Sequence, residues 1–460
     1  DADSLRKEIA AAQRGLPAAV QNGKDWHTPA GSAFTPRPVG QSGEVAFVYP
    51  GAFNSYPGLG AHWLHLFPQA HNFLHTLSES PADTVSDYAL YQRSLATPTR
   101  VEVRAFRSIL ANDQVAMMKS GSAFAVLFTQ VMRDVFKLKP AAAFGYSLGE
   151  GSMYWSMGVW QNADAAASRF EHSPLFRSRL FGRKEAVRAM WGLPPHASDD
   201  FWASFVLSAP YQDVIKHVQR ESRVYITHIN TPQETVIAGD IPACERIIAA
   251  MGVPALRAPF EVVIHNETMM SEFDELFRVH NNPLADQVLP IRFYSAADYA
   301  PAPLEQETIA RNIARVSCKV VDFPRLINRV YEDGARVFVE LGPGSTCARW
   351  VSDTLGDREH LSVSIDNLRG DDYTTLLRML ARLAVHRVSL DLSPLYEALV
   401  TTESRQMFKT ITLGGVPVRE AMLSAESRQR LESARVGQPR VNVPAPPMPT
   451  PRSTPAPIPQ

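Results

Sequence analysis

The stretch AAAFGYSLGE, residues 141–150, is the most informative part of the chain about its fold. Its first four residues form a short apolar run after Pro140, which ends an amphipathic helical pattern. The rest has the form G-x-S-x-G, with Gly145 and Gly149 on either side of Ser147, and a helix is expected from Glu150. Glycines permit a tight strand-to-helix turn that lifts the serine hydroxyl away from the backbone. The stretch predicts a nucleophile elbow, and the alternative is an ordinary glycine-rich connection between a strand and a helix.

Short apolar runs alternate with amphipathic segments on both sides of this stretch. Residues 44–49 (EVAFVY) predict a buried strand, and apolar residues 124, 127, 128, 131, 135 and 138 recur at helical spacing. Further strands are expected at 291–294 (IRFY) and 336–340 (RVFVE). This alternation is typical of an α/β fold.

Residues 187–262 have a different pattern. Two expected strands, 224–230 and 235–239, are joined by a turn that contains a proline. A helix over Ile241–Met251 and a third strand near Ala255 follow. We interpret this segment as a small α+β subdomain inserted into the larger one, whose α/β pattern resumes afterwards and closes near Leu399.

Composition excludes several classes of protein. The chain has 460 residues, 45% of them hydrophobic, and 46 basic against 47 acidic residues give a net charge of −1. So balanced a charge argues against nucleic acid or a membrane surface as the partner. No run approaches the roughly 18 apolar residues of a membrane span, and the N-terminus lacks the apolar region of a secretory signal. The 3 cysteines lie far apart without metal-binding spacing, so we expect no zinc site, no disulfide framework and a cytoplasmic location.

A serine nucleophile needs a base and donors for an oxyanion. The amide of Leu148, at the expected helix N-terminus, is one candidate donor. The turn-rich loops 49–60 and 342–344 each offer further backbone amides, or serve as plain connections. His265 ends an apolar run where the inserted segment rejoins the body, so it is a candidate base, although a lone histidine there is commonly a hydrogen-bonded structural residue. His62, His172 and His228 are not distinguishable from surface residues by spacing.

Five motifs in this order resemble the malonyl-CoA:acyl-carrier-protein transacylase family, and more narrowly the acyltransferase domains of iterative type I polyketide synthases. The branch they are most similar to contains polyunsaturated fatty acid, heterocyst glycolipid and enediyne synthases. The resemblance covers residues 46–399. The motifs are Tyr49-Pro-Gly with Gly58-Leu-Gly60, Gly145-Tyr-Ser-Leu-Gly-Glu150, Asn230-Thr-Pro with Val236-Ile-Ala-Gly239, Ile264-His-Asn266, and Phe338-Val-Glu-Leu-Gly-Pro-Gly344.

The resemblance implies a role for particular residues. Ser147 is the nucleophile and His265 its base, with the imidazole oriented by a backbone carbonyl. Ala52 and Leu148 supply the two oxyanion amides. The carboxylate-binding arginine falls at Arg179, two residues from the competing Arg177. A guanidinium in that position holds the malonyl carboxylate through two parallel charge-assisted hydrogen bonds.

Several positions depart from the family pattern. The usual Phe-Pro-Gly-Gln-Gly loop reads Tyr49-Pro-Gly-Ala-Phe53, which keeps the amide and loses the glutamine. Tyr146 replaces the histidine before the serine, Ile264 replaces an aromatic residue, and Ser120 stands where the family has a glutamine on the preceding helix. Because these positions shape the acyl pocket, they bear on the choice of acyl group rather than on the serine–histidine chemistry.

The resemblance also implies an organisation of the chain. We expect a large α/β-hydrolase-like core with a parallel sheet (residues 45–186 and 263–399) and an inserted ferredoxin-like subdomain (187–262). Residues 1–44 correspond to a ketosynthase-to-acyltransferase linker and 400–438 to a linker after the domain. Residues 439–460, with 9 prolines, predict an extended flexible tail.

The expected reaction is ping-pong transfer of malonyl from malonyl-CoA to the phosphopantetheine thiol of an acyl carrier protein, next to a ketosynthase module and without a bound cofactor or metal. Two alternatives remain open. A serine esterase or thioesterase also uses G-x-S-x-G, but its histidine normally lies near the C-terminus, whereas His265 follows Ser147 by 118 residues with a subdomain between them. An inactive acyltransferase-like scaffold that only docks neighbouring modules would form no acyl-enzyme.

Overall fold

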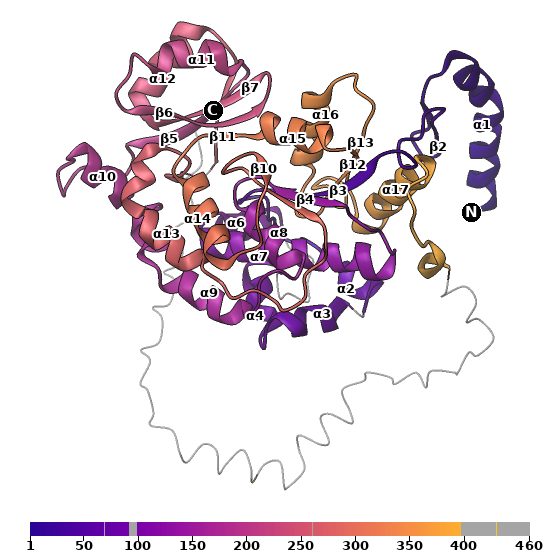
Figure 1. The fold of residues 1–460 in the computed structure, drawn as a ribbon, viewed down its shortest axis with the longest axis horizontal. Coiled ribbons are helices and arrows are strands. Elements are labelled where there is room, and N and C mark those ends of the chain that lie inside the picture. Colours follow the sequence, from indigo (N-terminus) through magenta and orange to yellow (C-terminus); the bar gives the residue numbers. More distant parts are fainter. Residues whose placement is uncertain (69, 92–98, 260, 397–428, 430–460) are drawn as a thin grey trace, which may run out of the picture. The chain divides into compact units, whose positions relative to one another are not determined.

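The computed structural model describes residues 1–68, 70–91, 99–259, 261–396 and 429 (Figure 1). The chain divides into two units, residues 1–395 and 396–460, and the helices and strands below all lie in the first. The predicted linker 400–438 lies outside the described residues apart from Gln429, and so does the whole predicted tail 439–460. The predicted domain boundaries and the linker role of residues 1–44 stay predictions.

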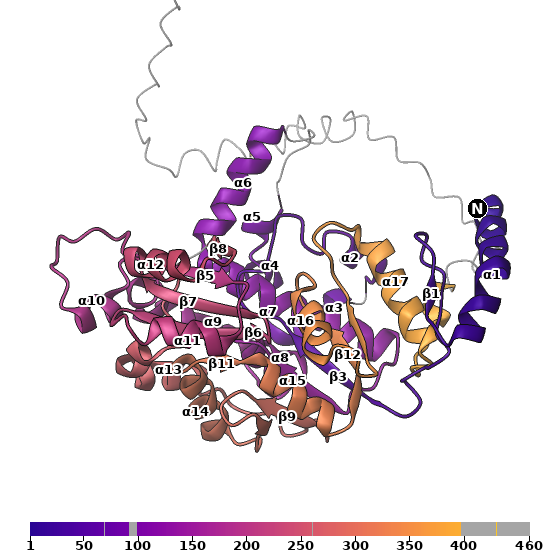
Figure 2. The same ribbon diagram turned by 90° about the horizontal axis from the view of Figure 1, so that it is seen from above.

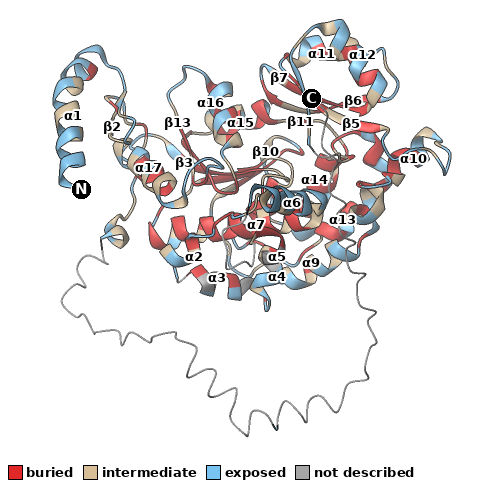
Figure 3. Cartoon of the chain, turned by 180° about the vertical axis from the view of Figure 1, so that it is seen from behind, coloured by how far each residue is buried: buried red, intermediate tan, exposed pale blue. Residues whose placement is uncertain are grey.

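A six-stranded sheet forms the core of the first unit. Its order is β10-β9-β4-β3-β12-β13, and every neighbouring pair is parallel except β10 with β9. The strands are β3 (Glu44–Tyr49), β4 (Ala142–Gly145), β9 (Arg292–Ser295), β10 (Ala300–Pro301), β12 (Ala335–Glu340) and β13 (Leu361–Ser364). The central strands read as continuous apolar runs because helices cover both faces of the sheet (Figure 3).

Alternate residues of β3 show how the two faces are covered. Phe47 and Tyr49 point to one side, where they join a cluster with residues of α7, α8 and α17, whereas Ala46 and Val48 point to the other, against α15 and α16 (Figure 2). These helices are α7 (Gln114–Gln130), α8 (Gly149–Ser156), α15 (Phe323–Glu332), α16 (Thr346–Leu355) and α17 (Asp372–Val385).

The helix that precedes the elbow is unusually apolar. α7 continues through a π-helical turn, Val131–Val135, so that Gln114–Val135 has the length and mean hydropathy, 1.3, of a membrane-spanning helix. In this protein 72% of its most apolar window is buried, with Phe124 and Phe128 packed in the core beside Trp63. Its composition is therefore explained by its place under the central sheet.

A second, five-stranded sheet belongs to the inserted segment. The chain order β5 (Trp202–Leu207), α11 (Tyr211–Val218), β6 (Val224–Thr231), β7 (Glu234–Asp240), α12 (Ile241–Met251) and β8 (Ala255–Arg257) is the βαββαβ motif of ferredoxin-like folds. Its strands are mutually antiparallel in the order β6-β7-β5-β8, with α11 and α12 packed on one face (Figure 1). The predicted α/β fold with an inserted α+β subdomain is thus confirmed, although sequence analysis did not identify β5.

Two residues of the large part complete this smaller sheet. β11 (Val321–Asp322) pairs in parallel with β6, with Val321 opposite His228. The pairing links the inserted segment directly to the loop between α14 (Gln306–Ser317) and α15. It therefore fixes β6, which carries His228 and Asn230, relative to the elbow.

The remaining elements surround these two sheets. The chain begins with α1 (Ala2–Asn22), and the hairpin of β1 (Trp26–His27) and β2 (Ala33–Phe34) follows it. The others are α2 (Trp63–Leu66), α3 (Ala70–Leu77), α4 (Pro81–Val85), α5 (Asp87–Leu90), α6 (Arg100–Asn112), α9 (Ala163–His172), a π-helical turn Leu175–Arg179, α10 (Glu185–Trp191), a 3₁₀ turn Glu267–Glu272, α13 (Phe273–His280) and a 3₁₀ turn Ser393–Leu395.

Candidate active site

The predicted elbow connects β4 to α8. Ser147 has φ 56°, a left-handed conformation that is rare for a residue with a side chain. The turn is tight because the backbone segments touch: a Cβ on Gly145 would lie 2.0 Å from the carbonyl carbon of Gly149, and one on Gly149 would lie 2.0 Å from the carbonyl oxygen of Tyr49. Both glycines are therefore required by close approach, and the strained serine is held by packing on each side.

The structure brings Ser147 and His265 together. The serine Oγ lies 2.7 Å from His265 Nε2, although 118 residues separate the two in the sequence. The other ring nitrogen, Nδ1, donates to the carbonyl oxygen of Val316 at 2.8 Å. A carbonyl only accepts, so Nδ1 carries the proton and Nε2 is left to accept the proton of the serine. This is the arrangement that activation of a serine nucleophile requires.

Burial and hydrogen bonding set the charge of His265. The side chain is buried, which disfavours the imidazolium and lowers its pKa to about 4, while the bond to Val316 opposes that shift. Val316 lies in the last turn of α14, whose carbonyls form the negative end of the helix dipole. The imidazole is therefore neutral at rest, and the imidazolium that forms during reaction is stabilised at the end of a helix.

Another histidine lies against the first. The ring of His228 is 4.7 Å from that of His265 in an edge-on arrangement, and burial holds its pKa well below the usual value. His228 Nδ1 is 2.9 Å from the hydroxyl oxygen of Thr227. Because it is also neutral, it adds no charge that would oppose protonation of His265 during reaction.

The two predicted oxyanion donors line the same cavity as Ser147. Leu148 is the residue before the first turn of α8, and Ala52 lies in the loop after β3. Within the described ranges, the backbone amide of neither residue donates to another protein group. Both amides are thus available to a substrate oxygen, in keeping with their predicted role.

A buried carboxyl group also lines this cavity. Glu150 on α8 accepts hydrogen bonds from the Ser295 hydroxyl at 2.6 Å and the Ala296 amide at 3.2 Å. Burial outweighs these bonds and raises its pKa to about 7. Through these hydrogen bonds Glu150 links the first turn of α8 to the end of β9 and so stabilises the elbow.

Comparison with known proteins agrees with the fold. No family model matches the chain. The chain is 26% identical over 426 residues to a polyunsaturated fatty acid synthase polypeptide of Thraustochytrium sp., and the match covers 89% of this chain and 20% of that protein. The chain therefore spans about one fifth of this relative.

Among solved structures, the acyltransferase domain from the second module of the salinomycin polyketide synthase has a TM-score of 0.61 at 21% identity, over 86% of this chain and 84% of that one. A type II polyketide synthase acyl-carrier protein in complex with its malonyl-transacylase matches with a TM-score of 0.55 at 18% identity, over 73% of this chain and 99% of that one. The chain therefore shares the fold of polyketide synthase acyltransferase domains and malonyl-transacylases.

The arginine predicted to bind the substrate carboxylate has a partner within the protein. Arg179 binds Glu272 through two parallel hydrogen bonds, from Nε to Oε2 at 3.0 Å and from Nη2 to Oε1. Arg179 is not among the described residues that line the cavity of Ser147, and neither is Arg177, whose Nε donates to the Glu171 carbonyl at 3.0 Å. The guanidinium edge best suited to a carboxylate is therefore occupied by one from the protein itself.

A network that sequence analysis missed joins the elbow to the inserted subdomain. The hydroxyl of the partly buried Tyr146 donates to Asn230 Oδ1 at 2.6 Å, and the Asn230 amide donates to Glu234 at 2.9 Å. Trp350 on α16 donates to the same carboxylate at 3.2 Å. In the sequence, Asn230 stands out only as part of a motif, and no local pattern around Tyr146 or Asn230 indicates that the two side chains are in contact.

The residue in the position of the family glutamine has a different task. Ser120 is buried, and its hydroxyl has two hydrogen-bond acceptors, the carbonyl oxygen of Ala116 at 2.7 Å and Ser55 Oγ at 2.9 Å. Ser55 in turn donates to Met117 O at 3.1 Å. Ser120 therefore fastens the loop after β3 to α7 and does not line the cavity of Ser147.

Proposed function

We propose that this chain transfers an acyl group from a thioester donor to the thiol of a carrier through an ester on Ser147. The observation that carries the proposal is the Ser147 Oγ to His265 Nε2 contact at 2.7 Å, together with the Val316 bond that leaves Nε2 as the acceptor. Serine oxygen attacks the thioester carbon while His265 takes its proton, and the departing thiolate then receives that proton. The carrier thiol reverses these steps, with His265 again as base.

The donor and acceptor are proposed from the resemblance to malonyl-CoA:acyl-carrier-protein transacylases. A CoA thioester is the proposed donor, and the phosphopantetheine arm of an acyl carrier protein is the proposed acceptor, beside a ketosynthase within a polyketide or polyunsaturated fatty acid synthase. The malonyl-transacylase that is similar to this chain is bound to an acyl-carrier protein in its structure. A cytoplasmic location, as expected from the cysteines, is part of the same proposal.

Malonyl is the proposed acyl group on the strength of the resemblance, and the structure defines what its binding requires. Arg179 has to leave Glu272, or present its other edge, to hold the carboxylate of the substrate. A carboxylate that found no such partner would lie against the buried Glu150 and would be disfavoured.

Intact-mass spectrometry after brief incubation with malonyl-, methylmalonyl- and acetyl-CoA tests the proposal. We expect a covalent acyl adduct that disappears in Ser147→Ala. Malonyl loading faster than acetyl loading, with the preference reversed in Arg179→Ala, supports malonyl. If wild type and Arg179→Ala show the same preference for malonyl over acetyl, the substrate carboxylate binds to Arg177 or to no arginine.

The two alternatives make different predictions in the same experiment. An inactive docking scaffold forms no adduct with any donor. A hydrolase forms one, but loses it to water as fast as to a carrier thiol. The available oxyanion amides and the oriented imidazole favour an active enzyme over a scaffold.

A further inference from the structure

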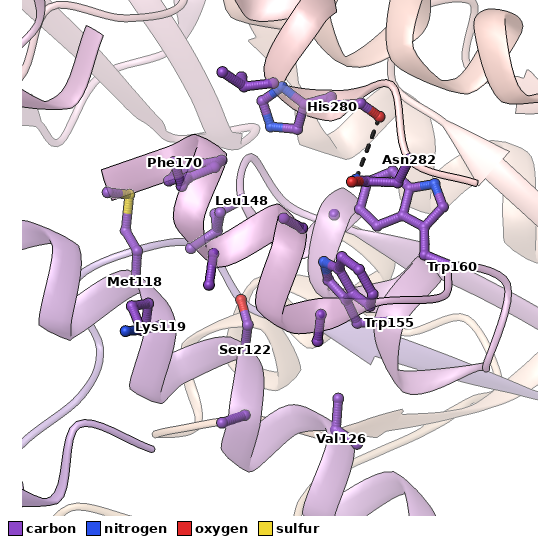
Figure 4. Close-up of a pocket in the computed structure, with 16 residues that line it drawn as sticks. Met118, Lys119, Ser122, Val126, Leu148, Trp155, Trp160, Phe170, His280 and Asn282 are labelled. Carbon is purple, nitrogen blue, oxygen red and sulfur yellow. Dashed lines mark hydrogen bonds between the residues drawn. The ribbon is translucent and has the colours of Figure 1, made fainter. Parts of the chain in front are cut away.

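A second hollow, between α7, α8 and α9, lies beside the cavity of Ser147 and shares part of its wall. Five residues line both: Met118, Leu148, Gly151, Phe170 and His280. The second hollow has a cavity volume of about 120 Å³, so it has room for part of an acyl chain rather than for a drug-sized ligand. Figure 4 shows it from within, with Met118 and Lys119 on one side and Trp155 and Trp160 on the other. An acyl group on Ser147 can therefore extend past Leu148 into this space.

The shape of this hollow comes from small residues on two helices. Gly151 on α8 and Ala163, Ala166 and Ala167 on α9 line it where larger side chains would close it. Aromatic rings, including Trp155 and Phe170, form much of the remaining wall. Small and aromatic residues in this arrangement leave a slot suited to a flexible hydrocarbon chain.

The second hollow suits an uncharged acyl tail, whereas a malonyl carboxylate depends on Arg179, which lines neither hollow. Lys119 is the one Lys or Arg among the described residues that line them, and it is paired with Glu171 at 2.6 Å. His280 donates from Nδ1 to the Leu276 carbonyl at 2.8 Å and is neutral because burial lowers its pKa to about 4. An apolar chain leaves none of these groups unpaired.

We propose that Ser147 accepts linear apolar acyl groups of medium length, whose tails lie in the hollow between α7, α8 and α9. The proposal rests on the proposed Ser147 chemistry and names a class of acyl group for that site. In the loading step the Ser147 Oγ–carbon bond forms, the thioester carbon–sulfur bond breaks, and the serine proton passes through His265 to the departing sulfur. In the second step a carrier thiol gives its proton to His265 and its sulfur bonds to the acyl carbon, the Ser147 Oγ–carbon bond breaks, and the proton passes from His265 to Ser147 Oγ.

A chain-length series on the wild-type chain is the first test. Acetyl-, octanoyl-, decanoyl- and dodecanoyl-CoA are supplied at equal low concentration, and the rate constant for Ser147 acylation is followed by intact mass. Because each CH₂ leaves water, we expect kcat/KM to rise about two- to fourfold per added CH₂ until the hollow is full. A dodecanoyl rate at or below the acetyl rate would overturn the proposal.

A matched pair of variants locates the effect. Ala167→Trp places an indole in the hollow, and Ala165→Trp places one on the same helix at a residue that does not line it. The ratio of dodecanoyl to acetyl loading should fall at least about tenfold in Ala167→Trp and stay at the wild-type value in Ala165→Trp. An unchanged ratio in Ala167→Trp would place the chain elsewhere. If no donor loads the wild-type chain, malonyl-CoA included, the proposed function itself fails, so the two failures are distinguishable.

Discussion

The pH dependence of Ser147 acylation follows from the environment of His265. The base must be neutral to accept the serine proton, so the rate falls as pH falls through the pKa of this imidazole. Burial lowers that pKa to about 4 from its usual value of 6.5. At pH 5, about nine-tenths of the imidazole is then neutral, compared with about 3% at the ordinary pKa, a difference of about 30-fold in rate.

The groups around His265 sharpen this prediction. Burial lowers the pKa of His228 well below its usual value and that of His280 to about 4, so both histidines favour the neutral form. Glu150 is the exception, since its pKa of about 7 gives the cavity a titration in the same range. Glu150→Gln should remove any inflection near pH 7 and leave the low-pH limb in place.

Acylation is measured by rapid-quench mass spectrometry with an uncharged acetyl thioester of N-acetylcysteamine, because the phosphates of CoA titrate in this window. We expect a rate nearly constant from pH 8 to 5, with half the maximum close to pH 4. An inflection near 6.5 that persists in Glu150→Gln would refute the account of a buried, neutral base.

Three further perturbations test the surroundings of the site. Tyr146→Phe leaves the buried Asn230 oxygen without its donor, so urea denaturation should show that the free energy of unfolding falls by about 1–2 kcal/mol. In the control Tyr331→Phe, which removes a hydroxyl that bonds to none of the described residues, the free energy of unfolding should stay within about 0.5 kcal/mol of wild type. Gly149→Ala forces a Cβ to within 2.0 Å of the Tyr49 carbonyl oxygen and should lower the free energy of unfolding by about 1–3 kcal/mol. Gly151→Ala, whose Cβ would have its nearest neighbour 3.7 Å away, should leave it unchanged. Equal stability of the two variants would contradict the close contact between Gly149 and Tyr49. Glu272→Gln frees Arg179, so the ratio of malonyl to acetyl loading should rise. Glu275→Gln weakens the separate ion pair with Arg278 and should leave that ratio unchanged. An unchanged ratio in Glu272→Gln would show that Arg179 does not bind the substrate carboxylate.

The sequence predicts the elbow well because its determinants are local. Gly145, Ser147 and Gly149 lie within five residues, and the close contacts that require the glycines arise in the same turn. β3 likewise matches its predicted bounds, because a strand covered on both faces is a continuous apolar run. β5 was missed, since its partners β7 and β8 lie later in the chain and its residues alternate between buried and partly exposed.

Contacts between distant segments account for the rest. His265 was only one candidate among thirteen histidines until the fold placed it against Ser147. The pairing of Arg179 with Glu272 joins positions 93 residues apart, and no local pattern marks Glu272 as a partner. The hollow between α7, α8 and α9 depends on how three helices pack, so its small residues read in sequence as ordinary helix formers.

The most direct test of the central claim is a pulse–chase of the acyl-enzyme. The chain is loaded with the donor that reacts fastest, excess donor is removed, and either a holo-acyl carrier protein or buffer alone is added while intact mass is followed. We predict that the Ser147 ester disappears much faster with the carrier, which gains the acyl group in equal amount. An adduct that stays on the protein, that is lost to water at the same rate with and without carrier, or that forms equally in Ser147→Ala would contradict acyl transfer through Ser147.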